Sequence, residues 1–494
     1  MIRSLLVNWL VASCAMLLAC SEGAVPPPPV FTSNDVRLDD GPDATESLAL
    51  RACMTGDRLA TVWTEDRDGV IGVWFQTSGD AGATWLTAPI ELSATPKTAA
   101  RPTIACDGDV LAVAWEDTRD GDLDLPNLWT TATGDGGATW SEPVRIEPDL
   151  YGRYPSTAPS LAIRDGIIHA VWMDQLYGAY DIFYATSSDL GGSWTEPVRL
   201  DGDLAGESWS GWPVIAVDET QLVVAVEDTR AGASDVLVTR SLDAGATWDA
   251  PVRVDTGDAD GATESHAITM SVEAGEVALV WQDRRDGGHY GIYYNYSPDG
   301  VTWLDGALRA DGALPGEYDA GAPALVRADG ALHLVYEDDR NGDRDVWYRR
   351  IVGAELDPEI GLASNLTGQQ AYSPRVAAGP DGVAVAWVDT RYDQENLAED
   401  LFYVLSADGG ETWTGDLRLN GWEGGTTYVA DPSIGFAGGR LAATWIDGRE
   451  GSSDVWYGSV VPGDNAHNPD PDPEPATGET PATGTTTETT GETP

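Results

Sequence analysis

The chain has 494 residues, and its 28 Lys and Arg residues stand against 81 Asp and Glu residues, for a formal net charge of −53 at pH 7. Such a surface repels nucleic acid and anionic membranes, which makes both poor partners. It suits a soluble acidic protein, or one that binds cations or neutral ligands, with two or three ordinary domains or one large repeat domain.

Residues 1–19 are predicted to be an export signal. Arg3 precedes an apolar run over residues 5–18, and the run ends before Cys20 and the polar Ser21. The sequence around Cys20 resembles the lipobox of bacterial lipoproteins, which implies that the signal peptidase cuts before Cys20 and that its thiol carries lipid. An ordinary secretory signal is the alternative. The lipoprotein resemblance, with Ser21 after the cysteine, implies a location in the bacterial cell envelope, at the outer membrane.

Residues 20–30 form the next predicted segment, a proline-rich spacer. Its four consecutive prolines, Pro26 to Pro29, favour a stiff polyproline helix that holds the folded part away from the membrane. No later stretch is long and apolar enough for a membrane crossing. The membrane is therefore expected to be touched only through the lipid anchor.

A short turn phrase, close to Ser-x-Asp-x-Gly-x-Thr-Trp, recurs between residues 31 and 462. Its Asp can accept backbone N–H bonds, its Gly supplies a positive φ, and its Trp folds back over apolar surface. Six copies occur, the fifth one residue short, at Ser78 to Trp85, Thr133 to Trp140, Ser187 to Trp194, Ser241 to Trp248, Ser297 to Trp303 and Ser406 to Trp413. Each copy lies between two β-rich runs, which predicts a hairpin turn.

A second phrase, aromatic-x-Asp-x-Arg, recurs eight times at spacings of 51 to 58 residues. Five regular copies begin at Trp115, Trp281, Tyr336, Trp387 and Trp445, and degenerate copies lie at Trp63-Asp66-Arg67, Trp172-Asp174 and Val226-Asp228-Arg230. A residue that recurs in every unit is expected to build the scaffold, with the Asp and the Arg paired to each other. The functional alternative is a ring of these side chains around a pocket for an anionic or polyhydroxylated ligand.

Each unit is predicted to form four short antiparallel strands, which is typical of a β-propeller blade. The eighth unit ends after its third strand, at Asp454 to Tyr457, whereas Asn34 to Leu38, before the first unit, matches the fourth-strand phrase. We therefore predict an all-β, eight-bladed propeller over residues 31–462, closed by the N-terminal strand that completes the last blade. Seven blades are the alternative, if one unit is not a true blade.

Two cysteines, Cys53 and Cys106, fall at similar places in consecutive units. In an oxidising cell envelope they could form a disulfide between neighbouring inner strands. Two buried free thiols are the alternative, because neighbouring strands in different blades need not come within disulfide reach.

The six turn phrases resemble Asp-boxes, and the region 31–462 is similar to the sialidase-like family of Asp-box (BNR-repeat) propellers. In this family the boxes lie between third and fourth strands, away from the active face, and they occur in many non-hydrolytic proteins. Catalytic members also carry three arginines that clamp the substrate carboxylate, a Tyr nucleophile paired with Glu, and an Asp acid/base. Their first arginine stands two residues before the proline that opens an inner strand, where this chain has Ala100, Thr157, Gly211, Gly321, Tyr372 and Ala430. The six blades usual for the enzymes also differ from the eight predicted for this chain.

Candidate ligand-binding residues are those that interrupt the repeat in the loops joining a fourth strand to the next first strand. Aromatic rings beside charged groups are typical of sugar recognition, because a ring face packs on a pyranose while polar groups meet its hydroxyls. These candidates are Tyr151, Arg153, Tyr154, Trp209, Trp212, His266, Tyr318, Tyr372, Trp422 and Tyr428. Rings that simply cap the blades are the alternative.

The protein is therefore expected to act as a monomer that binds a glycan or a protein partner on this face, without clear catalytic machinery. One alternative is a divergent exo-sialidase-like glycoside hydrolase, for which Tyr318 and Glu317 are the catalytic candidates. The other is a purely structural surface protein. No cofactor is expected, although acid-rich hairpins such as Asp338 to Asp345 leave calcium open; each contains an arginine that would oppose the ion.

From residue 463 the chain is rich in Asp, Pro, Gly, Glu and Thr and contains no large apolar residue. Such a segment cannot bury a core. Residues 463–494 are therefore predicted to be a disordered tail.

Overall fold

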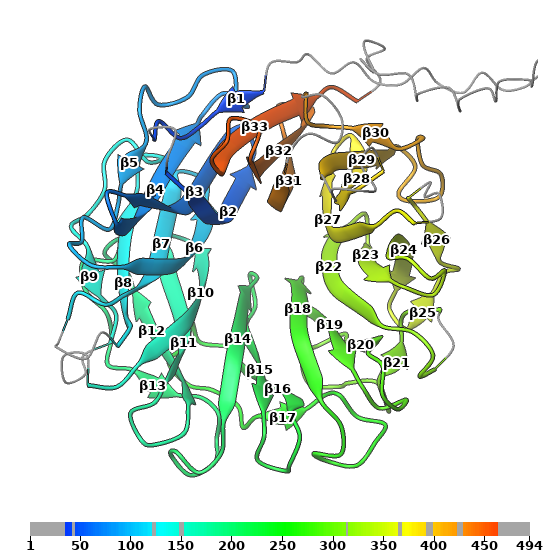
Figure 1. Cartoon of the computed structure of the whole chain (residues 1–494). Coiled ribbons are helices and arrows are strands. Elements are labelled where there is room, and N and C mark those ends of the chain that lie inside the picture. The colour runs from blue at the N-terminus through cyan, green and yellow to red at the C-terminus, as the bar shows by residue number, and fades with distance from the viewer. Residues whose placement is uncertain are drawn as a thin grey trace, which may run out of the picture.

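The computed structural model describes residues 35–41, 45–120, 125–147, 153–312, 315–363, 368–391, 399–421 and 428–462. They form eight separate β-sheets in a ring around a central opening, and no helix occurs among them (Figure 1). The predicted all-β propeller is confirmed, with eight blades rather than seven. The predicted signal (1–19), spacer (20–30) and tail (463–494) lie outside the described residues and stay predictions. Within the described part of the chain, no helix has the length and apolar character needed to cross a membrane.

Each blade is built from strands that follow one another from the central opening outward. The first four blades contain β2 (Ser47–Thr55), β3 (Arg58–Arg67), β4 (Val70–Ser78) and β5 (Ile90–Glu91); β6 (Ala99–Asp107), β7 (Val110–Asp117), β8 (Asn127–Thr133) and β9 (Val144–Arg145); β10 (Ser156–Arg164), β11 (Ile167–Asp174), β12 (Asp181–Ser187) and β13 (Val198–Arg199); and β14 (Ser210–Val217), β15 (Leu222–Asp228), β16 (Asp235–Ser241) and β17 (Val252–Arg253). The last four contain β18 (Ser265–Glu273), β19 (Glu276–Asp283), β20 (Gly291–Ser297) and β21 (Leu308–Arg309); β22 (Ala320–Ala328), β23 (Ala331–Asp338), β24 (Asp345–Val352), β25 (Glu355–Leu356) and β26 (Ile360–Gly361); β27 (Ala371–Gly379), β28 (Gly382–Asp389), β29 (Asp400–Ser406) and β30 (Leu417–Arg418); and β31 (Val429–Ala437), β32 (Arg440–Asp447), β33 (Asp454–Val460) and β1 (Val36–Arg37). In the sixth blade both β25 and β26 pair with β24, so that this sheet has five strands.

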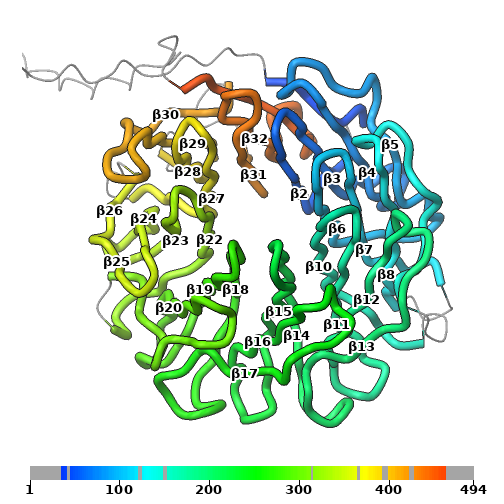
Figure 2. The backbone as a smooth tube through the Cα atoms, turned by 180° about the vertical axis from the view of Figure 1, so that it is seen from behind, coloured from blue at the N-terminus to red at the C-terminus, as the bar shows by residue number. Residues whose placement is uncertain are grey.

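The ring closes as predicted, because the N-terminal strand β1 pairs with β33 in the last blade. Arg37 of β1 reaches Asp39 and Asp454, at 2.6 Å in each case. The two ends of the described chain therefore lie side by side, as Figure 2 shows from behind.

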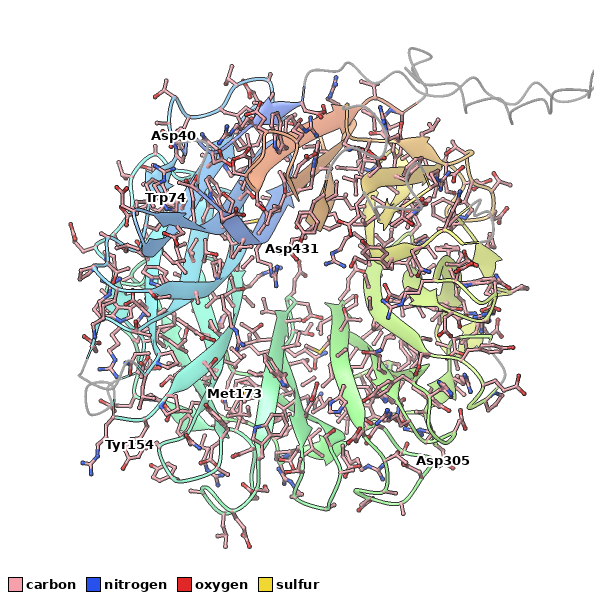
Figure 3. The ribbon with its side chains drawn as sticks, in the orientation of Figure 1. Asp40, Trp74, Tyr154, Met173, Asp305 and Asp431 are labelled. Carbon is pink, nitrogen blue, oxygen red and sulfur yellow. A yellow bond between two sulfur atoms is a disulfide. The ribbon has the colours of Figure 1, made fainter. Side chains whose placement is uncertain are left out.

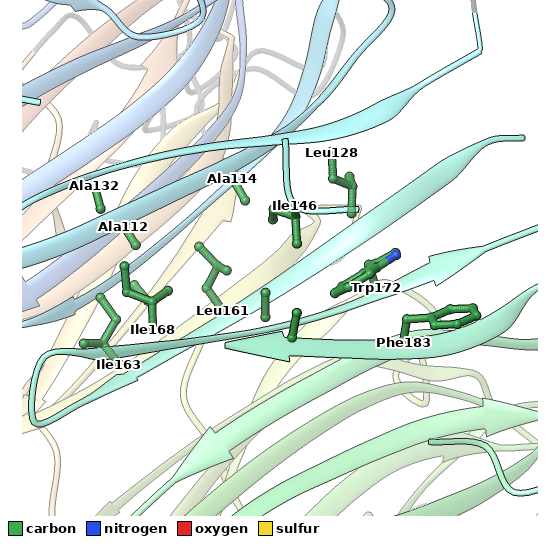
Figure 4. Packing of buried hydrophobic residues seen from close by; sticks show 13 residues of the cluster. Ala112, Ala114, Leu128, Ala132, Ile146, Leu161, Ile163, Ile168, Trp172 and Phe183 are labelled. Atoms are coloured by element: carbon green, nitrogen blue, oxygen red, sulfur yellow. The ribbon is translucent and has the colours of Figure 1, made fainter. Parts of the chain in front are cut away.

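The hydrophobic core lies between neighbouring blades rather than within one. In the layer between the second and third blades, Ala112, Ala114 and Leu128 belong to one cluster with Leu161 and Trp172 (Figure 4). The aromatic residues of the second strands are almost fully buried in such layers: Trp63, Trp115, Trp172, Trp281, Tyr336, Trp387 and Trp445. Successive side chains of a strand point to opposite faces, and each face of a blade meets a neighbour.

The aromatic-x-Asp-x-Arg phrase is a closed structural clip, as its repetition predicted. In the second blade, the Trp115 indole donates to Asp117 at 3.1 Å. Arg119 contacts the same carboxylate at 2.5 Å, and its guanidinium lies over the Trp129 ring. Corresponding pairs are Arg230–Asp228, Arg285–Asp283, Arg340–Asp338, Arg391–Asp389 and Arg449–Asp447. These side chains are engaged with one another and do not form an open ring around a pocket.

The first blade forms this clip with a different acid from the expected one. The sequence suggested Trp63, Asp66 and Arg67, but the strand register places Glu65 where the other blades have their Asp. Glu65 accepts bonds from Trp63 at 3.0 Å and from Arg67 at 2.7 Å. The expected role of Asp66 was wrong, because this side chain points the other way and accepts the Gly69 N–H in the hairpin.

The six turn phrases are hairpin turns between third and fourth strands, as predicted. In the fourth blade, Asp243 accepts the Thr247 N–H at 2.8 Å. Gly245 in this turn has a φ of 88°, and a Cβ there would collide with the Tyr184 hydroxyl of the preceding blade. Trp248 packs edge-on against the same Tyr184, with ring centroids 4.9 Å apart. The turn therefore packs against the preceding blade. Within its own blade it lies at the end opposite to the start of the inner strand.

Cys53 of β2 and Cys106 of β6 are joined by a disulfide, with their Cα atoms 6.2 Å apart. Of the two states that the sequence left open, the structure has the cross-link rather than two free thiols. The bond ties together the inner strands of the first two blades, below the residues that line the central cavities.

Candidate functional site

Every inner strand has a β-bulge close to its start, on the face that carries the loops entering the blades. In β10, the register with β11 shifts between Thr157 and Ser160, and Ala158 has a φ of 52°. The corresponding residues of the eight blades all have φ between 47° and 55°: Ala49, Arg101, Ala158, Trp212, Ala267, Ala322, Ser373 and Asp431. A bulge re-aims side chains locally. All of these residues except Ser373 line the centre of the ring.

Two adjoining cavities occupy this centre, with volumes of about 760 and 690 Å³. Both are lined by Arg51 of the first blade and by residues of the fifth. The larger cavity also contains Arg101 and Trp212, whereas the smaller contains Arg375 and Asp431. In Figure 3, Asp431 lies at the central opening.

Arg51 and Arg375 bring positive charge into the smaller cavity without an ion pair to any described carboxylate. Arg51 donates to the Leu50 carbonyl at 2.7 Å, and Arg375 donates to the Pro374 carbonyl at 3.0 Å. Burial and the nearby charge of Arg51 hold the pKa of Arg375 below the usual value of an arginine, although Asp431 acts in the opposite direction. Arg375 is partly buried and Arg51 is exposed, and the charges of two such neighbouring cations create a local potential that favours an anion.

Arg101 and Trp212 form a mixed cationic and aromatic wall in the larger cavity. The Arg101 guanidinium lies 5.5 Å from the centre of the Trp212 ring, and the tryptophan is 48% exposed. Arg101 is only loosely held, at 3.5 Å from Glu116 and 3.3 Å from the Thr157 hydroxyl. The Trp212 N–H donates to the sulfur of Met173 at 3.3 Å, which anchors the backbone below the ring.

His266 adds a titratable group to the larger cavity. Its Nδ1 lies 2.8 Å from the buried Glu227 carboxylate, whose other oxygen accepts the Ala267 N–H at 3.1 Å. The hydrogen bond to Glu227 raises the pKa of His266, burial opposes this rise, and Glu264 adds to it while Arg284 acts against it. His266 therefore holds its proton at higher pH than an isolated imidazole.

Tyr372 makes a tyrosine–glutamate contact on this face, because its hydroxyl donates to Glu399. The second Glu399 oxygen accepts the Val429 N–H at 3.1 Å. Burial and the Glu399 carboxylate raise the pKa of Tyr372, which favours the neutral phenol over the phenolate. By contrast, no contact among the described residues joins Tyr318 to Glu317, and neither of them lines the two cavities.

The other predicted site residues are spread over the face. Tyr154 lies at the outer edge of the ring (Figure 3), with the Arg153 guanidinium 5.7 Å from its ring centre. Trp209 packs against the core between the third and fourth blades, and Tyr428 is exposed. Outside the described residues lie Tyr151, Trp422 and the predicted lipidation site Cys20. Of the predicted set, the structure brings Trp212 and His266 together in a cavity.

Arg51, Arg101 and Arg375 are cavity residues that the sequence interpretation missed. The sequence interpretation looked for an arginine two residues before the proline of each inner strand. The bulge instead brings to the cavity the residues directly before and directly after that proline. Arg101 comes directly before its proline and Arg375 directly after it. The sequence did contain one indication of Arg51 and Arg375. These two residues occupy equivalent positions in their blades, and the other blades have small or short residues there: Thr103, Ser160, Val214, Thr269, Ala324 and Ser433.

One cluster of three acids among the described residues has the spacing of a metal site, and an arginine occupies it. Carboxylate oxygens of Asp181, Asp201 and Asp203 lie within 4.8 Å of one another. Arg199 lies among them, at 3.1 Å from Asp181, 2.6 Å from Asp201 and 2.9 Å from Asp203. Since Arg253 makes equivalent contacts in the next blade, the cluster is part of the repeated scaffold and offers no argument for calcium.

No protein-family model and no curated protein matches the chain. Among solved structures, it is similar to an α-L-arabinanase of Penicillium chrysogenum complexed with arabinobiose, with 19% identity, 61% of this chain and 92% of that chain covered, and a TM-score of 0.39. A polysaccharide lyase of family PL25, an ulvan lyase, has 11% identity, covers 76% of this chain and 96% of its own, and gives a TM-score of 0.49. The GH93 α-L-arabinofuranosidase of Fusarium graminearum has 15% identity, coverages of 72% and 92%, and a TM-score of 0.37. At such low values these likenesses indicate neither an activity nor a substrate, and the propeller assignment rests on the eight sheets of the chain itself.

Proposed function

We propose that the protein binds an acidic carbohydrate in the cavities at the centre of its propeller, without cleaving it. The observation that supports this proposal is the pair Arg51 and Arg375, two neighbouring arginines with no ion pair to a described carboxylate in a chain of net charge −53. A carboxylate or sulfate group on a sugar can accept charge-assisted hydrogen bonds from both guanidinium groups. The exposed ring of Trp212 offers a face for a pyranose in the adjoining cavity.

A divergent exo-sialidase-like hydrolase is the second candidate. The contact between Tyr372 and Glu399 favours it, since a tyrosine paired with a glutamate resembles the nucleophile of that family. The electrostatics oppose it, because burial and Glu399 raise the pKa of the phenol. Release of a fluorogenic group from an aryl sialoside, abolished in Tyr372→Phe, would favour hydrolysis over binding alone.

A purely structural role is the third candidate, and it requires a flat central face with buried aromatic rings. The two cavities and the exposed Trp212 ring disfavour it.

The expected location in the cell envelope, with lipid on Cys20, forms part of the proposal, as does the monomeric state. A lipid anchor would present the acidic propeller outside the membrane, which its charge repels. Metabolic labelling with a radioactive fatty acid tests this, because the label should enter the wild-type chain and not Cys20→Ser. Equal labelling of both chains would reject the anchor.

The binding proposal is tested on an array of acidic and neutral glycans with the mature protein. We expect binding to acidic glycans only, and a loss of roughly tenfold or more in affinity for Arg51→Ala/Arg375→Ala, because two charged hydrogen-bond donors are removed. Arg350→Ala is the matched control, since Arg350 pairs with the exposed Asp357 away from the cavities. Binding of neutral glycans that is insensitive to the double substitution would contradict the proposal.

A further inference from the structure

We infer that the two central cavities are adjoining subsites of one extended site, so that the ligand is an acidic oligosaccharide of at least two units. Its acidic unit binds at Arg51 and Arg375, and the ring of the neighbouring unit lies on Trp212 beside Arg101. This inference rests on the proposed function and adds to it the length of the ligand and the role of Trp212.

The two cavities are continuous but chemically different. They share Arg51 and two residues of the fifth blade, so a ligand can pass from one to the other without leaving the centre of the ring. The smaller cavity is lined by Arg375 and Asp431 and by no aromatic residue. The larger one contains Trp212. Each volume alone, about 760 or 690 Å³, lies in the range of a complete small-molecule site, so one sugar unit would leave most of the space unused.

Trp212 is unusual at its position in the repeat. Ala49, Ala158, Ala267 and Ala322 occupy the equivalent bulge position in four other blades, and all share a left-handed backbone near φ 50°. A bulky residue in this conformation is strained, and it persists only where the surroundings hold it in place. Here the strained residue leaves 48% of its surface exposed, in the cavity wall. Its ring is thus presented to the cavity instead of being packed in the core.

Arg101 complements this ring. Its side chain is 56% exposed, and its guanidinium lies 5.5 Å from the centre of the Trp212 ring. Because this guanidinium lies over one face of the indole, a pyranose would pack on the part of the ring that Arg101 leaves uncovered, with its hydroxyls within reach of the guanidinium at the edge of the ring. Arg51 borders both cavities, and it is close enough to Arg375 for their charges to interact. This arrangement requires an acidic unit followed by a second sugar ring.

The inference is tested by calorimetric titration of the mature protein with three matched pairs: galacturonic acid and digalacturonic acid, glucuronic acid and an unsulfated chondroitin disaccharide, and N-acetylneuraminic acid and 3′-sialyllactose. For the pair that binds, the longer ligand should bind at least tenfold more tightly than the monosaccharide. Trp212→Ala should remove this gain and leave the affinity for the monosaccharide within about twofold. Arg375→Ala should weaken both ligands.

Two further variants serve as controls for the role of the Trp212 ring. Trp212→Phe retains an aromatic face and should keep most of the gain, and Tyr177→Ala removes an exposed ring outside the cavities and should change nothing. Equal affinity for both members of the pair, or an equal loss for both in Trp212→Ala, would overturn the extended site while leaving acidic-sugar binding intact. Absence of binding to all six ligands and to every acidic glycan of the array, sulfated ones included, would overturn the proposed function itself, and the inference with it.

Discussion

Arg375 and Arg51 lie close enough for the charge of one to lower the pKa of the other, and both donate only to main-chain carbonyls among the described residues. Partial burial of Arg375 is unfavourable unless negative charge compensates it, and Asp431 and Glu337 attract this guanidinium without forming an ion pair with it. The chain has 81 acidic residues, so a carboxylate partner could easily have been placed there. The absence of such a partner at this pair is explained if a bound anion supplies the counter-charge.

At the residue scale, His266 should make binding depend on pH. Its hydrogen bond to Glu227 raises its pKa above 6.5, so it is protonated at pH 6 and loses its proton as the pH rises through the raised value. Deprotonation leaves the Glu227 charge unbalanced beside the ligand. We expect affinity for an acidic saccharide to fall severalfold between pH 6 and pH 9.

Titration calorimetry across this pH range measures the effect, and His266→Gln is the control. This variant keeps a hydrogen-bond donor for Glu227 but does not titrate, so its affinity should vary much less with pH. A slope that is unchanged in the variant would show that another group is responsible.

At the element scale, the recurring turn between the third and fourth strands and the bulge in the inner strand have different roles in a blade. The turn packs its glycine and tryptophan on the preceding blade, as Gly245 and Trp248 do on Tyr184. The bulge, at the other end of the blade, exposes side chains to the cavity. The contacts between blades and the proposed binding site therefore lie at different ends of the same four strands.

The contact between this turn and the preceding blade predicts different losses of stability when two glycines with similar backbone conformations are replaced by alanine. Gly245 and Gly69 have φ of 88° and 83°, but a Cβ at Gly69 would meet nothing within 4 Å, whereas a Cβ at Gly245 would strike the Tyr184 hydroxyl. Gly69→Ala should cost about 1 kcal/mol of unfolding free energy from backbone strain alone. Gly245→Ala should cost about 1–3 kcal/mol more, because the contact between blades must open. Urea unfolding measures both, and equal losses would show that the turn does not pack against its neighbour.

The fold could be predicted from the sequence because its information is local and repeated. An aromatic residue, an acid and an arginine recur in most of the eight units, so a few irregular copies do not alter the count of blades. The site could not be predicted to the same extent. A prediction of which side chains face the cavity depends on the alternation of side chains along a strand, and a bulge shifts that alternation. Trp212 and His266 were found as irregular residues in loops, whereas Arg101 and Arg375 lie inside strands, next to the prolines, and reach the cavity only through the bulge.

At the scale of the whole molecule, a second set of clips holds the fourth strands in place. Arg37, Arg199 and Arg253 each contact an acid that lies two residues after the fourth strand and an acid at the start of the third strand. Burial raises the pKa of Asp201 to about 7 and that of Asp454 to about 6. The folded protein therefore contains carboxyl groups whose protonated form is favoured over the ionised form more strongly than in the unfolded chain.

These acids predict greater stability at mildly acidic pH. A carboxyl whose pKa is raised in the folded state contributes stability fully below its unfolded value near 4, and loses that contribution as the pH rises to 6 or 7. The turn acids do the opposite: hydrogen bonds from Thr412 lower the pKa of Asp408 to about 2, and that support is lost as the pH falls below about 4. We expect the thermal midpoint to be highest between about pH 4 and 6, and added salt to raise it at pH 8, because salt screens the net charge.

Calorimetry on Asp201→Asn tests the cause. The variant should melt about 2 °C or more above the wild type at pH 8 and close to it at pH 5, whereas Asp305→Asn, at an exposed acid, should not distinguish the two pH values. A midpoint that rises steadily from pH 5 to pH 8 in the wild type would contradict this account.

The central claim is that the Arg51 and Arg375 pair holds the acidic group of a sugar ligand. The most direct measurement is a crystal structure of the mature protein with the acidic saccharide that binds most tightly. The account predicts the carboxylate or sulfate within hydrogen-bond distance of both guanidinium groups, with the next sugar ring over Trp212. A ligand bound on the outer loops, with Arg51 and Arg375 left untouched, would contradict it.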